Sequence, residues 1–156
     1  MSSTRLKSKL QNLEMRNREV TEGRCERTRC GEALRALVIE DSRAMRSSLA
    51  GILGEVGFEV TLAADAEEAV VILEDDCDFK LALVDWNLPA MSGLDLVIAI
   101  RRRPTHNDIK LMMVTTETQL GRVREALQAG ADEYIMKPFD REMLLEKLVL
   151  LGIEVD

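Results

Sequence analysis

The sequence predicts an α/β domain, a five-stranded parallel sheet with helices on both faces. Five short apolar runs alternate with five segments in which apolar residues recur at helical spacing. The connections between them are short, which favours parallel strands joined by right-handed crossovers. In addition, four of the apolar runs end in polar residues, at the edge of the sheet where open α/β folds bind their ligands. We expect this domain to span residues 34–156.

The predicted strands differ in how deeply they are buried. The run Leu81–Val84 is unbroken, as in a strand buried on both faces, whereas Phe58–Leu62 alternates like a strand nearer the sheet edge. The five predicted strands are 36–39, 58–62, 81–84, 109–114 and 133–136.

The predicted helices have recognisable ends. Capping residues precede four of them: Ser42, Asp65, Ser92 and Asp140. Gly130 fits a C-terminal cap, and the basic run 101–103 complements the dipole at another helix end. The side chains expected to face the core are Met45, Leu49, Ile52, Leu53 and Val56; Ala66, Ala69, Val70 and Leu73; Leu94, Val97 and Ile98; Leu120, Val123 and Leu127; and Met143, Leu144, Leu148 and Leu151.

The charge of the chain is unevenly distributed. The net charge is −7, with +4 on residues 1–35 and −11 on the remainder. An acidic globular part disfavours nucleic acid as its partner. Residues 1–33 contain no strand-like run, and we expect a basic N-terminal extension that is solvated rather than a docked helix.

Several features favour a cytoplasmic protein. No apolar run approaches the length of a membrane span, and the charged N-terminus lacks the apolar region of a secretory signal. Cysteines are few and odd in number (Cys25, Cys30 and Cys77), which favours free thiols in a reducing compartment. The one histidine, His106, lies in a polar loop and is expected to be solvated.

Polar side chains follow four of the five predicted strands. Glu40 and Asp41 follow the first strand, Asp85 the third, Thr115 the fourth and Lys137 the fifth. In a sheet of order 2-1-3-4-5, the three carboxylates converge at the crevice between strands one and three. Their repulsion calls for a cation, and oxygen ligands favour Mg²⁺. A carboxylate nucleophile, Mg²⁺, an ammonium group and a hydroxyl are together what phosphoryl transfer to an aspartate needs.

Each of these residues also has a simpler interpretation. Asp85 is equally typical of a turn, and Glu40 and Asp41 suit the start of a helix. Thr115 suits a helix cap, and Lys137 an exposed surface. The interpretation as a site depends on their joint occurrence at four strand ends of one sheet.

Residues 34–156 resemble the receiver domain of two-component response regulators, in particular the stand-alone chemotaxis-type regulators. The matching pieces are Ile39-Glu40-Asp41-Ser42, Val84-Asp85-Trp86-Asn87-Leu88-Pro89, Met91-Ser92-Gly93, Val114-Thr115, and Tyr134 with Met136-Lys137-Pro138-Phe139. The spacing agrees as well, with 30 residues from Asp85 to Thr115 and 22 from Thr115 to Lys137. The resemblance implies a flavodoxin-like (βα)5 fold and the strand order 2-1-3-4-5.

The resemblance also implies a metal site. Asp85 corresponds to the phosphoacceptor. Asp41 and Asp85 correspond to direct Mg²⁺ ligands, the backbone carbonyl of Asn87 to a third, and Glu40 to the residue that holds a water of the ion.

The remaining implied roles concern the phosphoryl group and the switch. Lys137 corresponds to the lysine that contacts the phosphoryl group, Thr115 to the switch hydroxyl, and Tyr134 to the aromatic switch position. Thr116 is bulkier than the small residue often found after the switch hydroxyl, which would restrict access. The basic N-terminal extension is not part of the receiver pattern.

The function expected from this resemblance is a phosphorylatable switch, a signalling protein that catalyses only its own phosphorylation and dephosphorylation. A histidine kinase or phosphotransfer protein would be the donor. A partner protein would read the surface formed by the fourth helix, fifth strand and fifth helix. Chemotaxis or motility is one pathway that the resemblance suggests, and neither DNA nor a membrane is an expected partner.

Three other functions fit parts of the pattern. A phosphatase that forms an aspartyl-phosphate usually carries a second acid two residues after its nucleophile, where this chain has Asn87. A flavodoxin-like binder of a small molecule would need a phosphate-binding loop after the first strand, and none is found there. A DNA-binding regulator would need an output domain, whereas few residues follow the last predicted helix.

Overall fold

The computed structural model describes residues 34–75, 78–116 and 121–153. The predicted extension over residues 1–33 lies outside this part of the chain and stays a prediction. Leu120 and Cys77 also lie outside it.

The structure is a parallel five-stranded sheet in the order β2-β1-β3-β4-β5, as expected. β2 is at one edge and is partly exposed, although its burial does not alternate strictly because Leu62 is 38% exposed, and β3 lies in the middle with every residue buried. The strands are β1 (Leu34–Ile39), β2 (Phe58–Ala63), β3 (Leu81–Asp85), β4 (Lys110–Thr116) and β5 (Glu133–Lys137).

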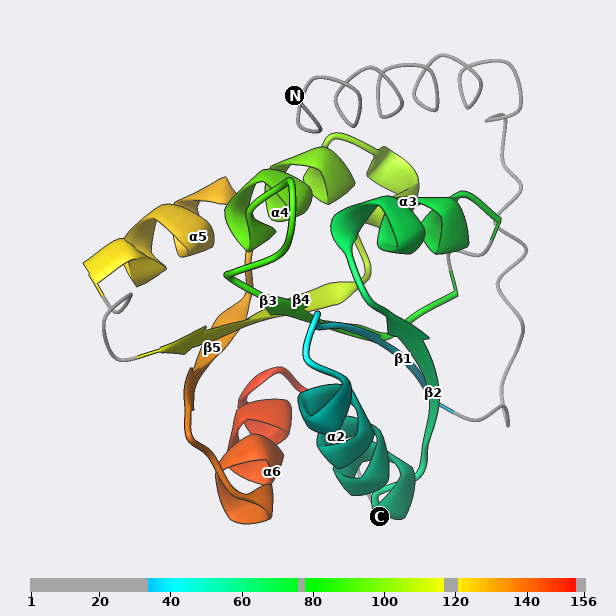
Figure 1. The fold of residues 1–156 in the computed structure, drawn as a ribbon, viewed down its shortest axis with the longest axis vertical. Coiled ribbons are helices and arrows are strands. Elements are labelled where there is room, and N and C mark those ends of the chain that lie inside the picture. Colours follow the sequence, from blue (N-terminus) through cyan, green and yellow to red (C-terminus); the bar gives the residue numbers. More distant parts are fainter. Residues whose placement is uncertain (1–33, 76–77, 117–120, 154–156) are drawn as a thin grey trace.

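Helices cover both faces of the sheet (Figure 1). In that view α3, α4 and α5 lie above the sheet, and α2 and α6 lie below it. The helices of the described residues are α2 (Arg43–Glu55), α3 (Ala66–Asp75), α4 (Gly93–Arg101), α5 (Val123–Ala129) and α6 (Arg141–Leu150), with a 3-10 turn η1 (Pro104–His106) after α4. None of the described helices is long and apolar enough to span a membrane.

The predicted caps form four helix N-termini. The side chains of Ser42, Asp65, Ser92 and Asp140 each accept a hydrogen bond from the backbone N–H three residues later, at 3.4, 2.8, 3.1 and 2.8 Å. Each bond satisfies an amide that has no partner within its helix. Because the caps fix where the helices begin, they also fix the length of the loops that follow the strands.

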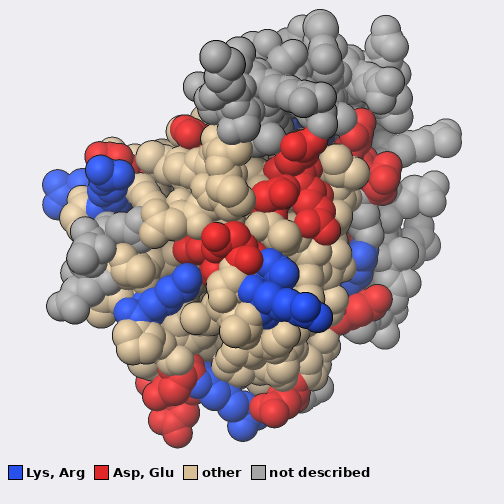
Figure 2. Space-filling view, in the orientation of Figure 1, with Lys and Arg blue, Asp and Glu red and all other residues tan. Residues whose placement is uncertain are grey.

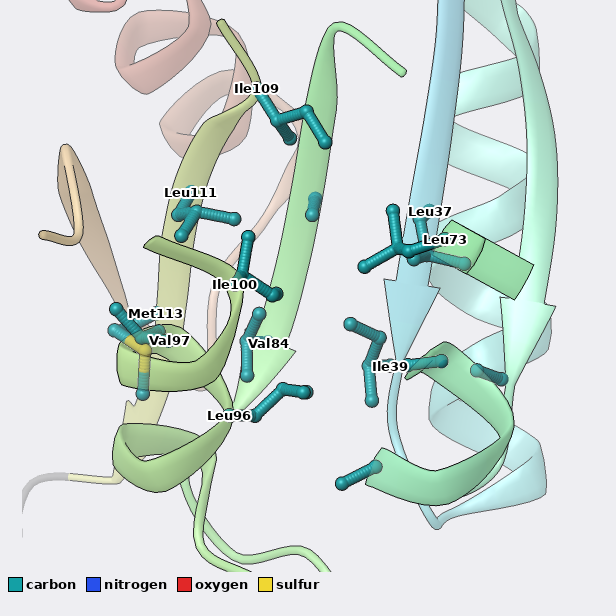
Figure 3. Packing of buried hydrophobic residues seen from close by; sticks show 14 of the residues in the cluster. Leu37, Ile39, Leu73, Val84, Leu96, Val97, Ile100, Ile109, Leu111 and Met113 are labelled. Atoms are coloured by element: carbon teal, nitrogen blue, oxygen red, sulfur yellow. The ribbon is translucent and has the colours of Figure 1, made fainter. Parts of the chain in front are cut away.

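Two apolar layers hold the helices on the sheet. Figure 3 shows the upper layer, where side chains of β1, β3 and β4 meet those of α3 and α4. The lower layer joins the opposite face of the sheet to α2 and α6. Since every residue of β3 is buried, the middle strand contributes to both layers, as its unbroken apolar run predicted.

Some of the predicted inward faces are wrong in detail. In α6, Leu144 and Leu148 are fully buried, but Met143 is 39% exposed. In α5, Val123 is buried, whereas Leu127 is 40% exposed and Ala126 takes its place in the core. Both errors have one cause: apolar residues at spacings of three and four both suggest a stripe, and packing selects only one of them.

The face of α4 is corrected in the same way. Val97 is buried as expected, but the other buried side chains are Leu96 and Ile100, whereas the expected Leu94 and Ile98 are only partly buried. Figure 3 shows the three buried side chains pointing at the sheet.

The basic run at the end of α4 does more than complement a helix dipole. The Arg101 guanidinium donates to the carbonyl oxygens of Gly130, His106 and Ile109 at 2.9, 2.8 and 2.7 Å, and pairs with Asp132 at 2.7 Å. Arg101 therefore joins α4 to the start of β4 and to the loop before β5. The residues it binds lie as far as 31 positions along the chain, which is why the sequence pattern did not show it.

His106 is buried rather than solvated, with 3% of its surface exposed. Among the described residues, its Nδ1 atom has no hydrogen-bond partner. Burial, reinforced by the positive charge of Arg103, lowers the pKa of this imidazole to about 4, although a hydrogen bond to the Leu73 backbone opposes the shift. The polar loop composition was misleading because η1 turns the ring inward.

Candidate functional site

The predicted polar residues meet at the carboxyl edge of the sheet. Ile39 pairs with Val84, so Glu40, Asp41 and Asp85 leave the sheet side by side. One carboxylate oxygen from each of the three lies within 4.8 Å of the other two. We call these three residues the acidic cluster. Glu40 and Asp85 are 1% and 5% exposed, whereas Asp41 is open to solvent.

Glu40 is held from two sides. Its Oε1 accepts a hydrogen bond from the N–H of Ser42 at 3.1 Å, and its Oε2 pairs with the Lys137 ammonium at 3.0 Å. Burial raises the pKa of the Glu40 carboxyl, and the nearby charge of Asp85 adds to this, while the bonds from Lys137 and Ser42 oppose it. The charged form of Glu40 is therefore costly unless further positive charge arrives.

Lys137, the last residue of β5, places a positive charge beside the acidic cluster. Its Nζ lies 3.0 Å from Glu40 Oε2 and 3.4 Å from Asp85 Oδ1. Burial alone would lower the pKa of Lys137, but the hydrogen bond to Glu40 and the charges of Asp85 and Glu40 outweigh it, and the pKa is raised. One ammonium thus faces two buried carboxylates, so the cluster keeps a surplus of negative charge.

Asp85 is fixed by its own loop. Its Oδ1 accepts a hydrogen bond from the N–H of Asn87 at 3.4 Å. Two hydrogen bonds fix the backbone of the next residue, Trp86. Its N–H donates to the carbonyl oxygen of Val114 at 3.0 Å, and its carbonyl oxygen accepts from the N–H of Gly93 at 2.9 Å. The side chain of Trp86 is buried in the upper apolar layer. The backbone around Asp85 has therefore little freedom, while its carboxylate reaches the cluster.

Gly93, the first residue of α4, is part of this arrangement. A Cβ atom there would overlap the backbone carbonyl oxygen of Asp85 and crowd the end of the Met113 side chain. Glycine is thus required for close approach of the helix to the strand end. The sequence marked Gly93 only as part of a matching motif.

Thr115 lies near the end of β4, next to the cluster. Val114 is the register partner of Asp85, and Thr115 follows it. The Thr115 side chain is fully buried, and its Oγ1 has no hydrogen-bond partner among the described residues. A buried hydroxyl without a partner is unusual and calls for an explanation. Its position suits a donor that bonds to a group bound above Asp85.

Tyr134 lies apart from the cluster, on the edge strand β5. Its register partner is Met113, and its ring packs partly on the upper apolar layer. From α6, the Lys147 ammonium lies 4.5 Å from the centre of the ring, and it also pairs with Glu133 at 3.2 Å. The structure therefore brings Glu40, Asp41, Asp85 and Lys137 together, and leaves Tyr134 partly buried on β5, against Lys147 of α6.

The acidic cluster fits a small divalent cation. Two oxygens bound directly to one Mg²⁺ lie up to about 4 Å apart, and an oxygen that binds through a water lies farther away. The observed limit of 4.8 Å matches such a mixed set, and all donors are hard oxygens. Lys137 alone does not neutralise the negative charge of the acidic cluster, and a bound Mg²⁺ would neutralise the remainder. Figure 2 shows acidic side chains flanked by basic ones in the middle of this face.

One residue of the site was missed from the sequence. Arg46 in α2 donates to the backbone carbonyls of Glu40 and Asp41 at 2.8 and 3.0 Å. Its spacing from Asp41 is compatible with such a contact, but an arginine on a helix gives no signal of this kind in the sequence.

Comparison with known proteins agrees with this fold. Chemotaxis protein CheY1 of Helicobacter pylori is 40% identical over 121 residues, which are 76% of this chain and 98% of that protein. Chemotaxis protein CheY of Pseudomonas aeruginosa is 32% identical over 115 residues, covering 74% of this chain and 93% of that protein.

Solved structures agree as well. The chemotaxis response regulator CheY4 of Vibrio cholerae superposes with a TM-score of 0.72 at 31% identity, covering 77% of this chain and 99% of its own. A CheY-like receiver domain protein of Methanospirillum hungatei gives a TM-score of 0.69 at 39% identity, over 77% and 94% of the two chains. The family model for the response regulator receiver domain matches residues 36–149, from β1 to α6. The family model and the relatives thus agree with the sheet order and with the carboxylates at the strand ends. This chain belongs to the response regulator receiver domain family.

Proposed function

We propose that this protein is a phosphorylation switch in which Asp85 accepts a phosphoryl group with the help of Mg²⁺. The observation that carries the proposal is the acidic cluster with Lys137 beside it, at the ends of three strands. In the phosphatase alternative the residue two positions after Asp85 would be an acid, and it is Asn87. The protein then catalyses only its own phosphorylation and dephosphorylation.

In this mechanism the residues of the site divide the work. An Asp85 carboxylate oxygen attacks the phosphorus of the donor, and the leaving group departs with the bonding electrons. Asp41, Asp85 and the Asn87 carbonyl would hold Mg²⁺, with Glu40 acting through a water, and the ion would supply positive charge for the phosphoryl oxygens. Lys137 supplies a further fixed charge.

The phosphoryl group is then sensed through Thr115. Its buried hydroxyl has no hydrogen-bond partner in the part of the chain that the structure describes, and it would donate to a phosphoryl oxygen. That bond draws the end of β4 inward and leaves room for Tyr134 to turn, which changes the surface of α5, β5 and α6. Leaving its present position would cost Tyr134 its contact with Lys147.

The partners follow from this chemistry. A histidine kinase or phosphotransfer protein would be the donor, and a protein would bind the α5–β5–α6 surface. The names of the relatives support chemotaxis as the pathway. We place the protein in the cytoplasm, where such donors act.

The proposal is tested by adding acetyl phosphate and Mg²⁺ while amide chemical shifts are recorded. Wild type should show changes in α5, β5 and α6 that disappear when Mg²⁺ is withheld. Thr115→Val should still take up phosphoryl but lose these changes, because it keeps the shape and lacks the hydroxyl. Thr115→Ser is the matched control and should retain them. Equal responses in the two variants would contradict a switch through the Thr115 hydroxyl.

A further inference from the structure

Arg46, in the first half of α2, holds the loop that carries two members of the acidic cluster. Its Nη1 atom donates to the carbonyl oxygen of Glu40 at 2.8 Å and to that of Asp41 at 3.0 Å. Both residues contribute a carboxylate to the cluster. One nitrogen of a helix side chain therefore holds the backbone of both residues.

The two carbonyls need this donor because the sheet has ended. β1 stops at Ile39, and the last bond to β2 is the one from Glu40 N–H to Ala63 at 3.0 Å. Carbonyl groups beyond the last hydrogen bond of the sheet require donors from elsewhere, and Arg46 donates one hydrogen bond to each of these two carbonyls. The Asp41 carboxylate forms no hydrogen bond or ion pair with the described residues, so its direction depends on the backbone that bears it.

We propose that Arg46 is a positioning residue for the cation site. By fixing two successive carbonyls, it aims the carboxylates of Glu40 and Asp41 at one point. This inference rests on the proposed function, since the cation concerned is the Mg²⁺ that the acidic cluster would hold. Groups that orient metal ligands in this way typically change metal affinity by about tenfold or more when they are removed.

The sign of the effect separates positioning from simple electrostatics. Arg46 is positively charged, and a positive charge near the cluster repels a cation. If charge alone mattered, removing Arg46 would strengthen Mg²⁺ binding. If positioning dominates, removing it weakens binding despite the lost repulsion.

Arg43 provides the matched control. It begins α2, is exposed, and forms no hydrogen bond or ion pair with the described residues. Arg43→Met therefore removes a charge close to Asp41 without touching the loop. Screened by water and salt, this should tighten Mg²⁺ binding by about twofold or less.

The experiment is a Mg²⁺ titration of the full chain, followed by the amide shifts of residues 40–42 and 87 in the folded protein. We expect Arg46→Met to bind Mg²⁺ about tenfold more weakly than wild type, and Arg43→Met to bind it as well or slightly better. An Arg46→Met protein that binds Mg²⁺ as tightly as Arg43→Met would overturn the inference. The readout is affinity in the folded state, which a loss of stability alone does not change.

Two further variants complete the test. Should Arg46→Met not fold, Arg46→Lys decides: it keeps the charge, but its ammonium is one bond closer to the backbone than Nη1 and does not reach the position from which Nη1 binds both carbonyls. Weaker Mg²⁺ binding by Arg46→Lys supports positioning, and binding equal to wild type overturns it. Asp41→Ala tests the site itself, and if wild type and Asp41→Ala bind Mg²⁺ equally, the proposed function fails and the inference fails with it.

Discussion

The burial of His106 predicts how the stability of the fold depends on pH. The imidazole is buried in η1, with the Arg103 charge nearby, and its pKa is about 4 instead of 6.5. The folded state therefore resists protonation between these two values, whereas the unfolded chain takes up a proton. Stability from this group is complete above pH 6.5 and is lost as the pH falls toward 4.

The size of the effect follows from the two pKa values. The difference corresponds to about 3 kcal/mol between pH 7.5 and pH 4, and to about 2 kcal/mol by pH 5. That is a large share of the 5–15 kcal/mol that typically stabilises a domain. Because His106 is the only histidine, no other imidazole contributes to the slope.

Urea unfolding at pH 7.5, 6.5, 5.5 and 5.0 measures this dependence. His106→Gln is the control, because glutamine can keep a donor toward the Leu73 backbone and does not titrate. We expect the unfolding free energy of wild type to fall by about 2 kcal/mol more than that of His106→Gln between pH 7.5 and 5.0. Parallel curves for the two proteins would refute the assignment of a buried, neutral imidazole.

Two further predictions concern single positions. Gly93→Ala should lower the unfolding free energy by about 2 kcal/mol and slow the phosphorylation of Asp85, because the added methyl group displaces the strand end. Gly51→Ala has open space around its Cβ and should instead stabilise α2 by about 0.5–1 kcal/mol in the same urea assay. Arg101→Lys should cost about 2–3 kcal/mol, because a lysine cannot reach the several carbonyls that Arg101 binds. Arg102→Lys, at an exposed position, should be neutral within about 0.5 kcal/mol, and equal losses in both variants would contradict the special role of Arg101.

Much of the fold was predictable from the sequence because its determinants are local. Apolar runs, caps such as Ser42 and Asp140, and the polar residues at four strand ends are properties of a few consecutive residues. In a parallel sheet those local ends necessarily share one edge, so the meeting of Glu40 with Asp85 followed from the strand order. The order itself came from the family resemblance and not from the residues.

What the sequence did not show depends on contacts across the fold. Whether Leu127 or Ala126 faces the core depends on how α5 packs, and both fit a helical stripe. Arg101 and Arg46 look like ordinary surface arginines until the carbonyls they bind are seen. His106 was assigned to solvent from the polarity of its neighbours, although the ring is buried.

The central claim is that Asp85 is the phosphoacceptor of a Mg²⁺-dependent site. The most direct measurement treats the protein with acetyl phosphate, with and without Mg²⁺, and maps the acid-stable, base-labile adduct to a residue by peptide mass. We predict a single phosphoryl group on Asp85 that requires Mg²⁺ and is lost in both Asp85→Asn and Asp41→Ala. An adduct on another residue, or one that survives Asp85→Asn, would contradict the account.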